Sequence, residues 1–355
     1  MADILHRYGP EYLRYNGDRV LPSHRKAIRD ITRCRTIDMR AGGLYRCDDC
    51  HRFHYAYRSC GNRHCPRCGN DKVDQWLQKQ QELLLPVDYF LVTFTLPQEL
   101  RAIAYTHQRD VYNAMFTASS AALKELAADR RFLGAKIGML GVLQTWQRNL
   151  DYHPHIHYLV PGGGLSADNR RWLYPKKRDF LVAQWPLGDL FRGKFKDQLE
   201  QLGFRGELPA GIWRQQWIVD CTPVGDGRRA LRYLGPYVHR VALSDRRITT
   251  LRNDRVSFRY TPSGTTRSKL RTLPAFVFIA LFLKHILPKG FMKIRYYGLL
   301  ASPSRTTLRT IRLAILTCRS QPPQPPPKQQ RIARCPHCGG PMQCIGFFER
   351  QRGPP

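Results

Sequence analysis

Apolar positions recur at helical spacing at both ends of the first 86 residues. Residues 1–36 follow this period, with a break at Leu21-Pro22, and the stretch 71–85 follows it again before Pro86. The residues between them, 37–70, lose the helical period and contain a concentration of cysteines. The N-terminal part is therefore predicted to be helical, with an irregular cysteine-rich insertion.

From residue 88 the pattern alternates between β-branched or aromatic runs and longer amphipathic runs. The runs predict strands over 89–96, 136–146, 153–160 and 217–222, and helices over 105–128, 187–202 and 228–243. The first six elements of this region follow the order strand, helix, strand, strand, helix, strand, which is the split βαβ pattern of ferredoxin-like folds. The expected fold class is α+β, an antiparallel sheet with helices on one face. A strand over 256–260 and a helix over 276–285 are expected after it.

Composition adds a partner class to this picture. The chain has 355 residues, 42% of them hydrophobic, and a formal net charge of +31 from 58 basic and 27 acidic residues. Such an excess points to a polyanion, since basic side chains release the counterions condensed on phosphate backbones. The apolar run 275–283 falls short of the ~20 residues of a membrane span. The charged N-terminus lacks the apolar region of a signal peptide, so we expect an intracellular protein without a membrane partner.

Two pairs of cysteines predict a zinc site. Cys47-x2-Cys50 and Cys65-x2-Cys68 have the spacing of a two-knuckle zinc ribbon. Cys60 and His64 are alternative ligands, and a redox function of the Cys-x2-Cys pairs is the competing interpretation. Far downstream, a polyproline spacer at 321–327 precedes a short tail with Cys335, Cys338 and Cys344, whose metal binding stays open.

Three histidines alternate along the predicted strand 153–160. His153, His155 and His157 project from one face, while Ile156 faces the core on the other. Two neutral imidazoles at such spacing can hold one divalent ion and leave positions open for a substrate oxygen. A polar strand face without a metal is the alternative.

A third ligand is expected from the neighbouring strand. If Arg148 pairs with His153 across the turn, antiparallel pairing places Gln144 opposite His157, on the same face. Gln147 and Asp151 are the alternatives.

Two tyrosines lie four residues apart on the predicted helix 228–243. Tyr233 and Tyr237 share one helical face, although Pro236 between them removes a backbone N–H and should kink the helix. A phenol beside a metal can attack a phosphodiester and hold the 5′-phosphate covalently. Both tyrosines could instead be packing residues.

These motifs together resemble one family. HPHIH at 153–157, YLGPYVHRVALSDRR at 233–247 and LPKGFMKIRYYGLLA at 287–301, with the cysteine-rich N-terminus, resemble the two-tyrosine rolling-circle transposases of bacterial insertion sequences. That family belongs to the HUH (His-hydrophobe-His) endonucleases, and the likeness extends over roughly residues 10–310 in the same order of motifs.

The resemblance implies metal-dependent cleavage and transfer of single-stranded DNA through a 5′-phosphotyrosine. His155 and His157 match the metal-binding pair, with His153 an additional imidazole, and Tyr233 and Tyr237 match the nucleophiles. It implies structural Zn²⁺, catalytic Mg²⁺ or Mn²⁺, and DNA at transposon ends and target in the bacterial cytoplasm, associated with the nucleoid. No Walker motif is present, so strand separation is expected to depend on host replication or helicase functions.

Three parts are expected on this basis. Residues 1–86 form a helical, zinc-binding N-terminal domain, residues 87–315 the HUH catalytic domain, and residues 316–355 a Pro-rich linker with a short cysteine-containing tail. The alternatives are a non-catalytic, zinc-dependent DNA- or RNA-binding protein and a nicking enzyme of the replication-initiator or relaxase type.

Overall fold

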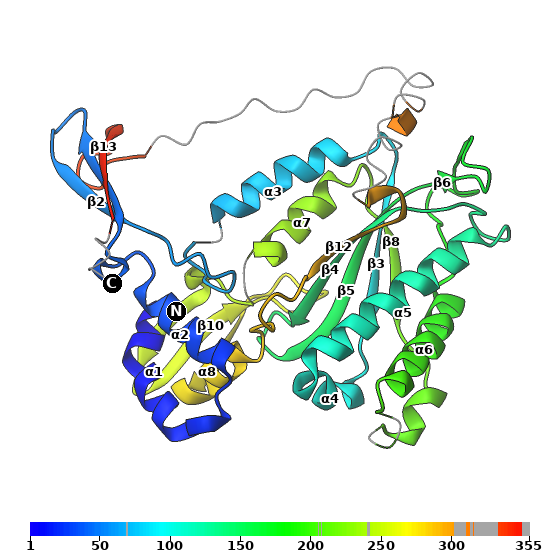
Figure 1. Ribbon diagram of the computed structural model, residues 1–355, viewed down its shortest axis with the longest axis horizontal. Helices are drawn as coiled ribbons and strands as arrows, with labels where there is room; N and C mark the ends of the chain where they lie inside the picture. The colour runs from blue at the N-terminus through cyan, green and yellow to red at the C-terminus, as the bar shows by residue number, and fades with distance from the viewer. Residues whose placement is uncertain are drawn as a thin grey trace, which may run out of the picture.

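The computed structural model is a mixed α and β protein built on antiparallel sheets (Figure 1). It describes residues 1–68, 70–204, 206, 208–239, 242–301, 310–312, 315 and 333–349, and only the backbone of residues 70–72, 210, 236, 237 and 239. Among the described residues, no helix combines the length and the apolar character that crossing a membrane requires.

The largest sheet has five strands in the order β12-β4-β5-β3-β8, and every neighbouring pair is antiparallel. The strands are β3 (Tyr89–Thr95), β4 (Met139–Trp146), β5 (Tyr152–Pro161), β8 (Val219–Pro223) and β12 (Ile294–Tyr297). The four predicted strands of this region are confirmed. The sequence did not predict β12, which extends one edge of the sheet.

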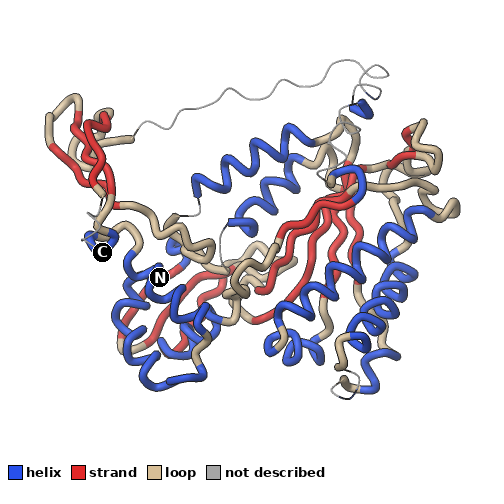
Figure 2. Tube along the Cα trace, viewed as in Figure 1, coloured by secondary structure: helices blue, strands red, loops and turns tan. Residues whose placement is uncertain are grey.

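The crossover helices lie on one face of this sheet, as Figure 2 shows. They are α4 (Arg101–Thr106) and α5 (Gln108–Ala128) between β3 and β4, and α6 (Gln184–Gln201) between β5 and β8. Phe94 on β3 is fully buried, and its ring packs edge-on against Tyr158 of β5 at 5.7 Å and Phe191 of α6 at 5.0 Å. This aromatic core fixes which side of β5 faces inward.

The opposite face of the sheet is covered as well, so the expectation of helices on one face only is incomplete. Helices α3 (Asn70–Leu83) and α7 (Arg228–His239) lie against each other over this face. Leu231 and Leu234 of α7 are fully buried against Val142 and Leu159 of the sheet. A Cβ at Gly235 would lie 3.0 Å from Leu77, so the glycine lets the two helices approach closely.

The first two helices form a separate core with a second sheet. Helices α1 (Ala2–Asn16) and α2 (Pro22–Arg33) confirm the predicted break, and Pro22 occupies the first turn of α2, where its missing N–H costs little. Their buried side chains pack with β9 (Ile248–Arg252), β10 (Arg255–Tyr260), β11 (Lys269–Pro274) and α8 (Ala275–Leu283). Residues 248–283, far away in the sequence, thus complete the core of the N-terminal helices.

The cysteine-rich segment 37–70, which was expected to be irregular, contains two strands. Strand β1 (Gly42–Cys47) pairs on one side with β2 (Phe53–Tyr57) and on the other with β13 (Met342–Phe348), in the order β13-β1-β2. The residues expected to form a tail therefore supply the third strand of an N-terminal sheet, seen at the upper left of Figure 1.

Two helix boundaries also differ from the sequence prediction. The expected helix 105–128 is interrupted at His107, and the expected helix 228–243 is described as far as His239, with residues 242–243 not helical. The short strands β6 (Gly164–Leu165) and β7 (Trp172–Leu173) follow β5 and pair with each other.

Candidate functional site

Strand β5 carries the three histidines in a row. The ring centroids of His153 and His155 are 5.2 Å apart, and those of His155 and His157 are 4.8 Å apart. Because Ile156 and Tyr158 enter the core beneath α5, the intervening imidazoles face the side covered by α7. His155 is 8% exposed and His157 is 6% exposed.

Hydrogen bonds hold the two inner imidazoles in defined orientations. Nδ1 of His155 donates to the carbonyl oxygen of His153 at 2.7 Å, which leaves its Nε2 as the nitrogen with a lone pair. Nδ1 of His157 lies 2.9 Å from Oγ1 of Thr93 on β3. Burial lowers the pKa of His157 to about 4, and burial together with His157 lowers the pKa of His155 well below its usual range. Both rings are neutral at physiological pH, the state that a metal ligand requires.

Gln144 lies beside this pair, in a register that differs from the predicted one. Its Cα partner is His155 rather than His157, because Gln147 and Asp151 close a tighter turn than the assumed pairing of Arg148 with His153. The two-residue shift keeps Gln144 on the same face. Its Nε2 donates to the carbonyl oxygen of Trp146 at 2.8 Å, and its buried Oε1 has no hydrogen-bond partner among the described residues.

The other two candidates for a third ligand are placed less favourably. Asp151 accepts hydrogen bonds from Arg271 and Asn149, each at 2.7 Å. Gln147 lines the same cavity as the histidines, but its side chain is exposed.

His153 has a different partner from the inner pair. Nη2 of Arg101 donates to its Nδ1 at 2.6 Å, so that nitrogen is occupied and Nε2 carries the proton. Burial, followed by the charge of Arg101, lowers the pKa of His153 to about 4. His153 therefore presents an N–H donor at the outer end of the row.

Helix α7 brings Tyr233 to the histidines. The helix begins after Gly227, whose φ of 77° suits glycine, and the carboxylate of Asp226 accepts the Arg228 N–H at 3.0 Å. The ring of Tyr233 lies edge-on to His157, with the centroids 5.8 Å apart. Tyr233 is 39% exposed, so its phenol is accessible from outside.

The side chain of Tyr237 lies outside the described residues. The backbone of α7 continues through position 236 as far as His239, so the helix does not end at Pro236. The function of Tyr237 stays a prediction.

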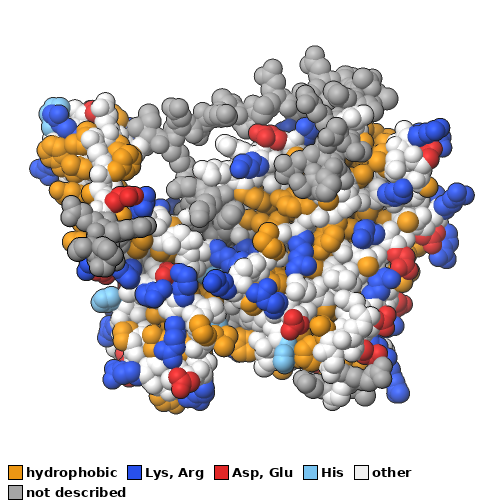
Figure 3. Space-filling model, viewed as in Figure 1, with side chains coloured by type: hydrophobic (Ala, Val, Ile, Leu, Met, Phe, Trp, Pro, Cys, Tyr) orange, Lys and Arg blue, Asp and Glu red, His pale blue; other side chains and the backbone are white. Residues whose placement is uncertain are grey.

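A cavity of about 530 Å³ joins these groups. Its walls include His153, His155, His157, Gln144 and Tyr233, together with the cations Arg148 and Lys269. Among the residues that the structure describes, none that lines this cavity is an Asp or Glu. In Figure 3, Lys and Arg side chains gather across the middle of the visible face. The cavity therefore suits an anionic ligand.

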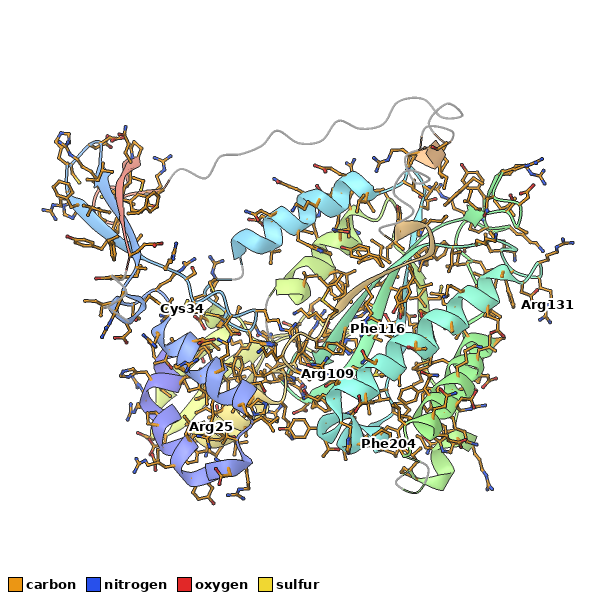
Figure 4. All side chains as sticks on the ribbon, viewed as in Figure 1. Arg25, Cys34, Arg109, Phe116, Arg131 and Phe204 are labelled. Atoms are coloured by element: carbon orange, nitrogen blue, oxygen red, sulfur yellow. The ribbon has the colours of Figure 1, made fainter. Side chains whose placement is uncertain are left out.

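The predicted grouping of the cysteines is wrong, because the four ribbon cysteines divide between two sites. Cys65 and Cys68 lie with the alternative ligand Cys60 and with Cys34, all four sulfur atoms within 4.8 Å of one another. Figure 4 labels Cys34 at the end of α2, where the chain turns toward β1. The close sulfur atoms share their hydrogen bonds, which lower the pKa of Cys68 and raise the pKa of Cys65. We call this set the helix-side cysteine cluster.

The other two ribbon cysteines lie in a second site. Cys47 and Cys50 are grouped with Cys335 and Cys338, again with all sulfur atoms within 4.8 Å. We call this set the sheet-side cysteine cluster. Cys344 belongs to neither cluster and is exposed.

His64, the other alternative zinc ligand, has a different position from the one expected. Its Nε2 accepts a hydrogen bond from the Leu287 N–H at 3.3 Å, and it is not part of either cysteine cluster. Neighbouring Arg63 donates to the carbonyl oxygens of Phe291 at 2.6 Å and Pro288 at 2.8 Å. These contacts join the helix-side cluster to the LPKGF segment that precedes β12.

Two family models match the chain. The model "Transposase zinc-binding domain" matches residues 4–96, which contain the whole helix-side cluster. The model "Putative transposase" matches residues 138–307, which contain the histidine strand and α7.

Two relatives extend this likeness. "Putative transposase y4qJ" of Sinorhizobium fredii (strain NBRC 101917 / NGR234) is 36% identical, over 100% of this chain and 97% of its own length. "Transposase for insertion sequence element IS801" of Pseudomonas savastanoi pv. phaseolicola is 31% identical, over 71% of this chain and 64% of its own length. The chain belongs to the IS91/IS801 family of transposases.

Solved structures give only a partial match to this transposase. The conjugative relaxase TrwC in complex with oriT DNA, in its metal-bound form, aligns with a TM-score of 0.28 and 17% identity, over 33% of this chain and 44% of that one. The same relaxase with mutant oriT DNA aligns at 0.28 and 16%, over 36% and 48%.

Membership in the family has two direct consequences. The transposase is an enzyme of DNA strand cleavage and transfer in the general sense. Its cysteine clusters and its zinc-binding domain support Zn²⁺ as a structural metal.

No sequence motif identified Thr93, Arg101 or Cys34, although each contacts a predicted site residue. Thr93 and Arg101 orient His157 and His153 but have no motif of their own. For Thr93, the sequence offered only the predicted strand 89–96. Thr93 pairs with His157 because β3 and β5 are neighbours in the sheet. Cys34 follows a helix and is 26 residues from Cys60, so no knuckle spacing reveals it.

Proposed function

We propose that this transposase cleaves single-stranded DNA and transfers the cut strand, with the Tyr233 phenol as the nucleophile. The placement of Tyr233 carries the proposal. Its ring lies 5.8 Å from that of His157, and one cavity holds both residues together with His155 and Gln144. A phenol beside a metal site can attack a phosphodiester whose charge the metal neutralises.

The donor set beside Tyr233 fits a divalent cation. His155 offers its Nε2, His157 is held through Nδ1, and Gln144 offers a buried amide oxygen that has no hydrogen-bond partner among the described residues. Mg²⁺ or Mn²⁺ is the proposed ion, and the amide oxygen of Gln144 is a ligand type that suits both. When bound, the ion supplies Lewis-acid polarisation of the scissile phosphate.

The remaining chemistry belongs to side chains of this chain. The Tyr233 oxygen forms a bond to phosphorus and loses its proton, while the P–O3′ bond breaks and the 3′ oxygen takes up a proton. The 5′ end then remains on the protein as a phosphotyrosine. Arg148 and Lys269 line the cavity and can hold the flanking phosphates. Strand transfer reverses the step with a new 3′-hydroxyl.

Tyr237 is the proposed second nucleophile. On a helix it lies one turn beyond Tyr233, and α7 continues through its position. One phenol would hold a cleaved strand while the other attacks the next phosphodiester.

Single-stranded DNA at the ends of the element and at its target is the proposed substrate. The net charge of +31 and a cavity lined by cations suit a phosphate backbone. The N-terminal sheet adds exposed aromatic side chains, Phe53 at 59% and Tyr55 at 64% exposure, on which unpaired bases can stack. Host functions would separate the strands.

The topology supports the finer fold assignment. With β3, β4, β5 and β8 numbered one to four along the chain, the spatial order is four, one, three, two, with a crossover helix in each split unit. We therefore propose a ferredoxin-like HUH endonuclease core within residues 87–315. Residues 1–86 are proposed to recognise DNA with the zinc-binding module.

A covalent adduct tests the proposal. The full chain is incubated with single-stranded oligonucleotides that carry the element's ends, with Mg²⁺ or Mn²⁺, and SDS-resistant adducts are mapped by mass spectrometry. We expect an adduct on Tyr233 that is absent in Tyr233→Phe and present in Tyr260→Phe, a matched control because Tyr260 lines the same cavity from β10. An adduct mapped only to Tyr237 would refute the assignment of the nucleophile. Tight binding without any adduct would favour a non-catalytic DNA-binding protein.

A further inference from the structure

The sheet-side cysteine cluster joins two distant parts of the chain. Cys47 is the last residue of β1 and Cys50 follows it, whereas Cys335 and Cys338 precede β13. The sulfur atoms of Cys47 and Cys338 are 3.4 Å apart, and those of Cys50 and Cys335 are 3.7 Å apart. Four thiolates around a tetrahedral zinc ion at ~2.3 Å lie about 3.8 Å from one another, so the cluster has nearly the dimensions of a zinc site.

Each half of the cluster is a tight turn that points its sulfur atoms inward. The Cys50 N–H donates to Sγ of Cys47 at 3.5 Å, and the Gly339 N–H donates to the carbonyl oxygen of Cys335 at 2.9 Å. Gly339 has a φ of 78°, which only glycine adopts readily. Cys-x2-Cys turns of this kind are the usual halves of a structural zinc site.

Backbone contacts bring the two turns together. The Asp48 N–H donates to the carbonyl oxygen of Pro341 at 3.0 Å. A Cβ at Gly340 would lie 2.1 Å from Oδ2 of Asp49, so the side chain of Asp49 in the first turn lies directly against the second turn. From there β13 pairs with β1 along its length, from Cys47 opposite Met342 to Gly42 opposite Phe348.

We propose that the transposase binds a second structural zinc ion through Cys47, Cys50, Cys335 and Cys338, and that this ion fastens residues 333–349 to the N-terminal sheet. The matched zinc-binding domain ends at residue 96, so half of the ligands lie outside it. The helix-side cluster holds the first ion with a separate set of four cysteines. The C-terminal segment is thus an integral part of the zinc-binding module.

The N-terminal sheet β13-β1-β2 has little buried surface to stabilise it without a metal. It consists of three short strands, and its side chains Tyr55 and Phe347 are 64% and 82% exposed. Hydrophobic side chains are visible over this sheet at the upper left of Figure 3. A sheet with so little buried surface is marginal alone, and small modules of this kind are commonly stabilised by a metal.

The fastened strand also completes an aromatic group. The ring of Phe348 packs edge-on against Tyr55 and Tyr57, with centroids 5.9 Å from each. Loss of the ion would release Phe348 from this group and leave one edge of β1 without its β13 partner.

The test begins with metal content of the purified full chain, measured by inductively coupled plasma mass spectrometry. We expect two zinc ions per chain in the native protein and one in the double variant Cys335→Ser/Cys338→Ser. Cys344→Ser is the matched control, because Cys344 is an exposed cysteine of β13 outside both clusters, and it should retain two ions. One ion in all three proteins would overturn the proposal, and so would a disulfide between Cys47 and Cys338 in non-reducing peptide maps.

A second measurement keeps the proposal testable if the double variant fails to fold. A protease site placed within residues 321–327 of the otherwise native chain allows the C-terminal part to be cut off. We expect the released fragment to co-elute with the body of the protein and to separate after a zinc chelator is added. Separation without chelator, or co-elution that survives complete zinc removal, would contradict the proposed site.

Discussion

Thr93→Val is the change that best tests the proposed metal site of the histidine strand. Oγ1 of Thr93 lies 2.9 Å from Nδ1 of His157 and can accept a hydrogen bond from the Nδ1–H, which leaves Nε2 as the nitrogen with the lone pair for a metal. Valine has nearly the same shape but cannot accept a hydrogen bond. The imidazole then keeps its place in the sheet and loses the partner that fixes its orientation.

The size of the effect follows from burial. His157 is 6% exposed, so an N–H deprived of its acceptor costs about 1–3 kcal/mol. Loss of a partner behind a metal-ligating histidine weakens metal binding by ~10–100-fold, which agrees with that range. We therefore expect the Mn²⁺ concentration for half-maximal cleavage to rise by that factor, while saturating Mn²⁺ restores most of the rate.

Thr95→Val is the matched control on the same strand. Thr95 is also half-buried and lines the same cavity, and its Cα partner is His155, whose Nδ1 already donates to the carbonyl oxygen of His153. In Thr95→Val, the Mn²⁺ concentration for half-maximal cleavage should stay near the native value. In Thr93→Ser, which keeps the hydroxyl, this concentration should return most of the way to the native value. The assay is cleavage of a labelled single-stranded oligonucleotide across a Mn²⁺ titration. Equal metal requirements in Thr93→Val and Thr95→Val would refute the reasoning.

Three further changes probe other parts of the molecule. Gln144→Met removes the proposed amide ligand at similar volume, so the metal requirement should rise at least ~10-fold, and a native Mn²⁺ titration would exclude Gln144 as a ligand. Arg63→Met deprives the carbonyl oxygens of Pro288 and Phe291 of a charged donor, and chemical denaturation should show a loss of about 2–4 kcal/mol; a loss below 1 kcal/mol would contradict this. Lys293 is buried, and burial followed by the charge of Arg63 lowers its pKa to about 7. Because its unfolded form binds the proton up to about pH 10.4, Lys293 makes native stability rise between pH 7 and pH 10. Lys293→Met should flatten that part of the pH profile in denaturant titrations, and an unchanged slope would argue against the shift.

The sequence predicted the parts of the fold that depend on local pattern. The alternation of His153, His155 and His157 with Ile156 is a property of one strand. It therefore predicts that the imidazoles share a face, whichever strands pair with β5. The register of Gln144 was predicted incorrectly, because it depends on the geometry of the turn at Gln147–Asp151. A slip of two residues preserves the face of the strand, which is why Gln144 still lies at the site.

The cysteines show what local spacing cannot predict. Cys-x2-Cys identifies half of a site, and the partner half is chosen by the folding of the whole chain. Cys65 and Cys68 are completed by Cys34 and Cys60, whereas the partners of Cys47 and Cys50 come from the other end of the sequence. These two halves are nearly 300 residues apart in the sequence, so no spacing motif relates them.

The contacts of Arg63 connect the helix-side cluster to the five-stranded sheet through a short series of hydrogen bonds. Arg63 and His64 lie within the loop of that cluster and hold the backbone of residues 287–291. Two residues later, the carbonyl oxygen of Lys293 accepts the Leu143 N–H at 2.9 Å, next to Gln144 on β4. The loop of the helix-side cluster is therefore connected by hydrogen bonds to β4, which carries the proposed metal ligand Gln144. The sheet-side cluster lies on a separate sheet, whose described strands pair only with one another. The two cysteine clusters thus differ in what they contact: the loop of the helix-side cluster holds the segment that leads into β12 of the five-stranded sheet, and the sheet-side cluster lies where β13 joins β1.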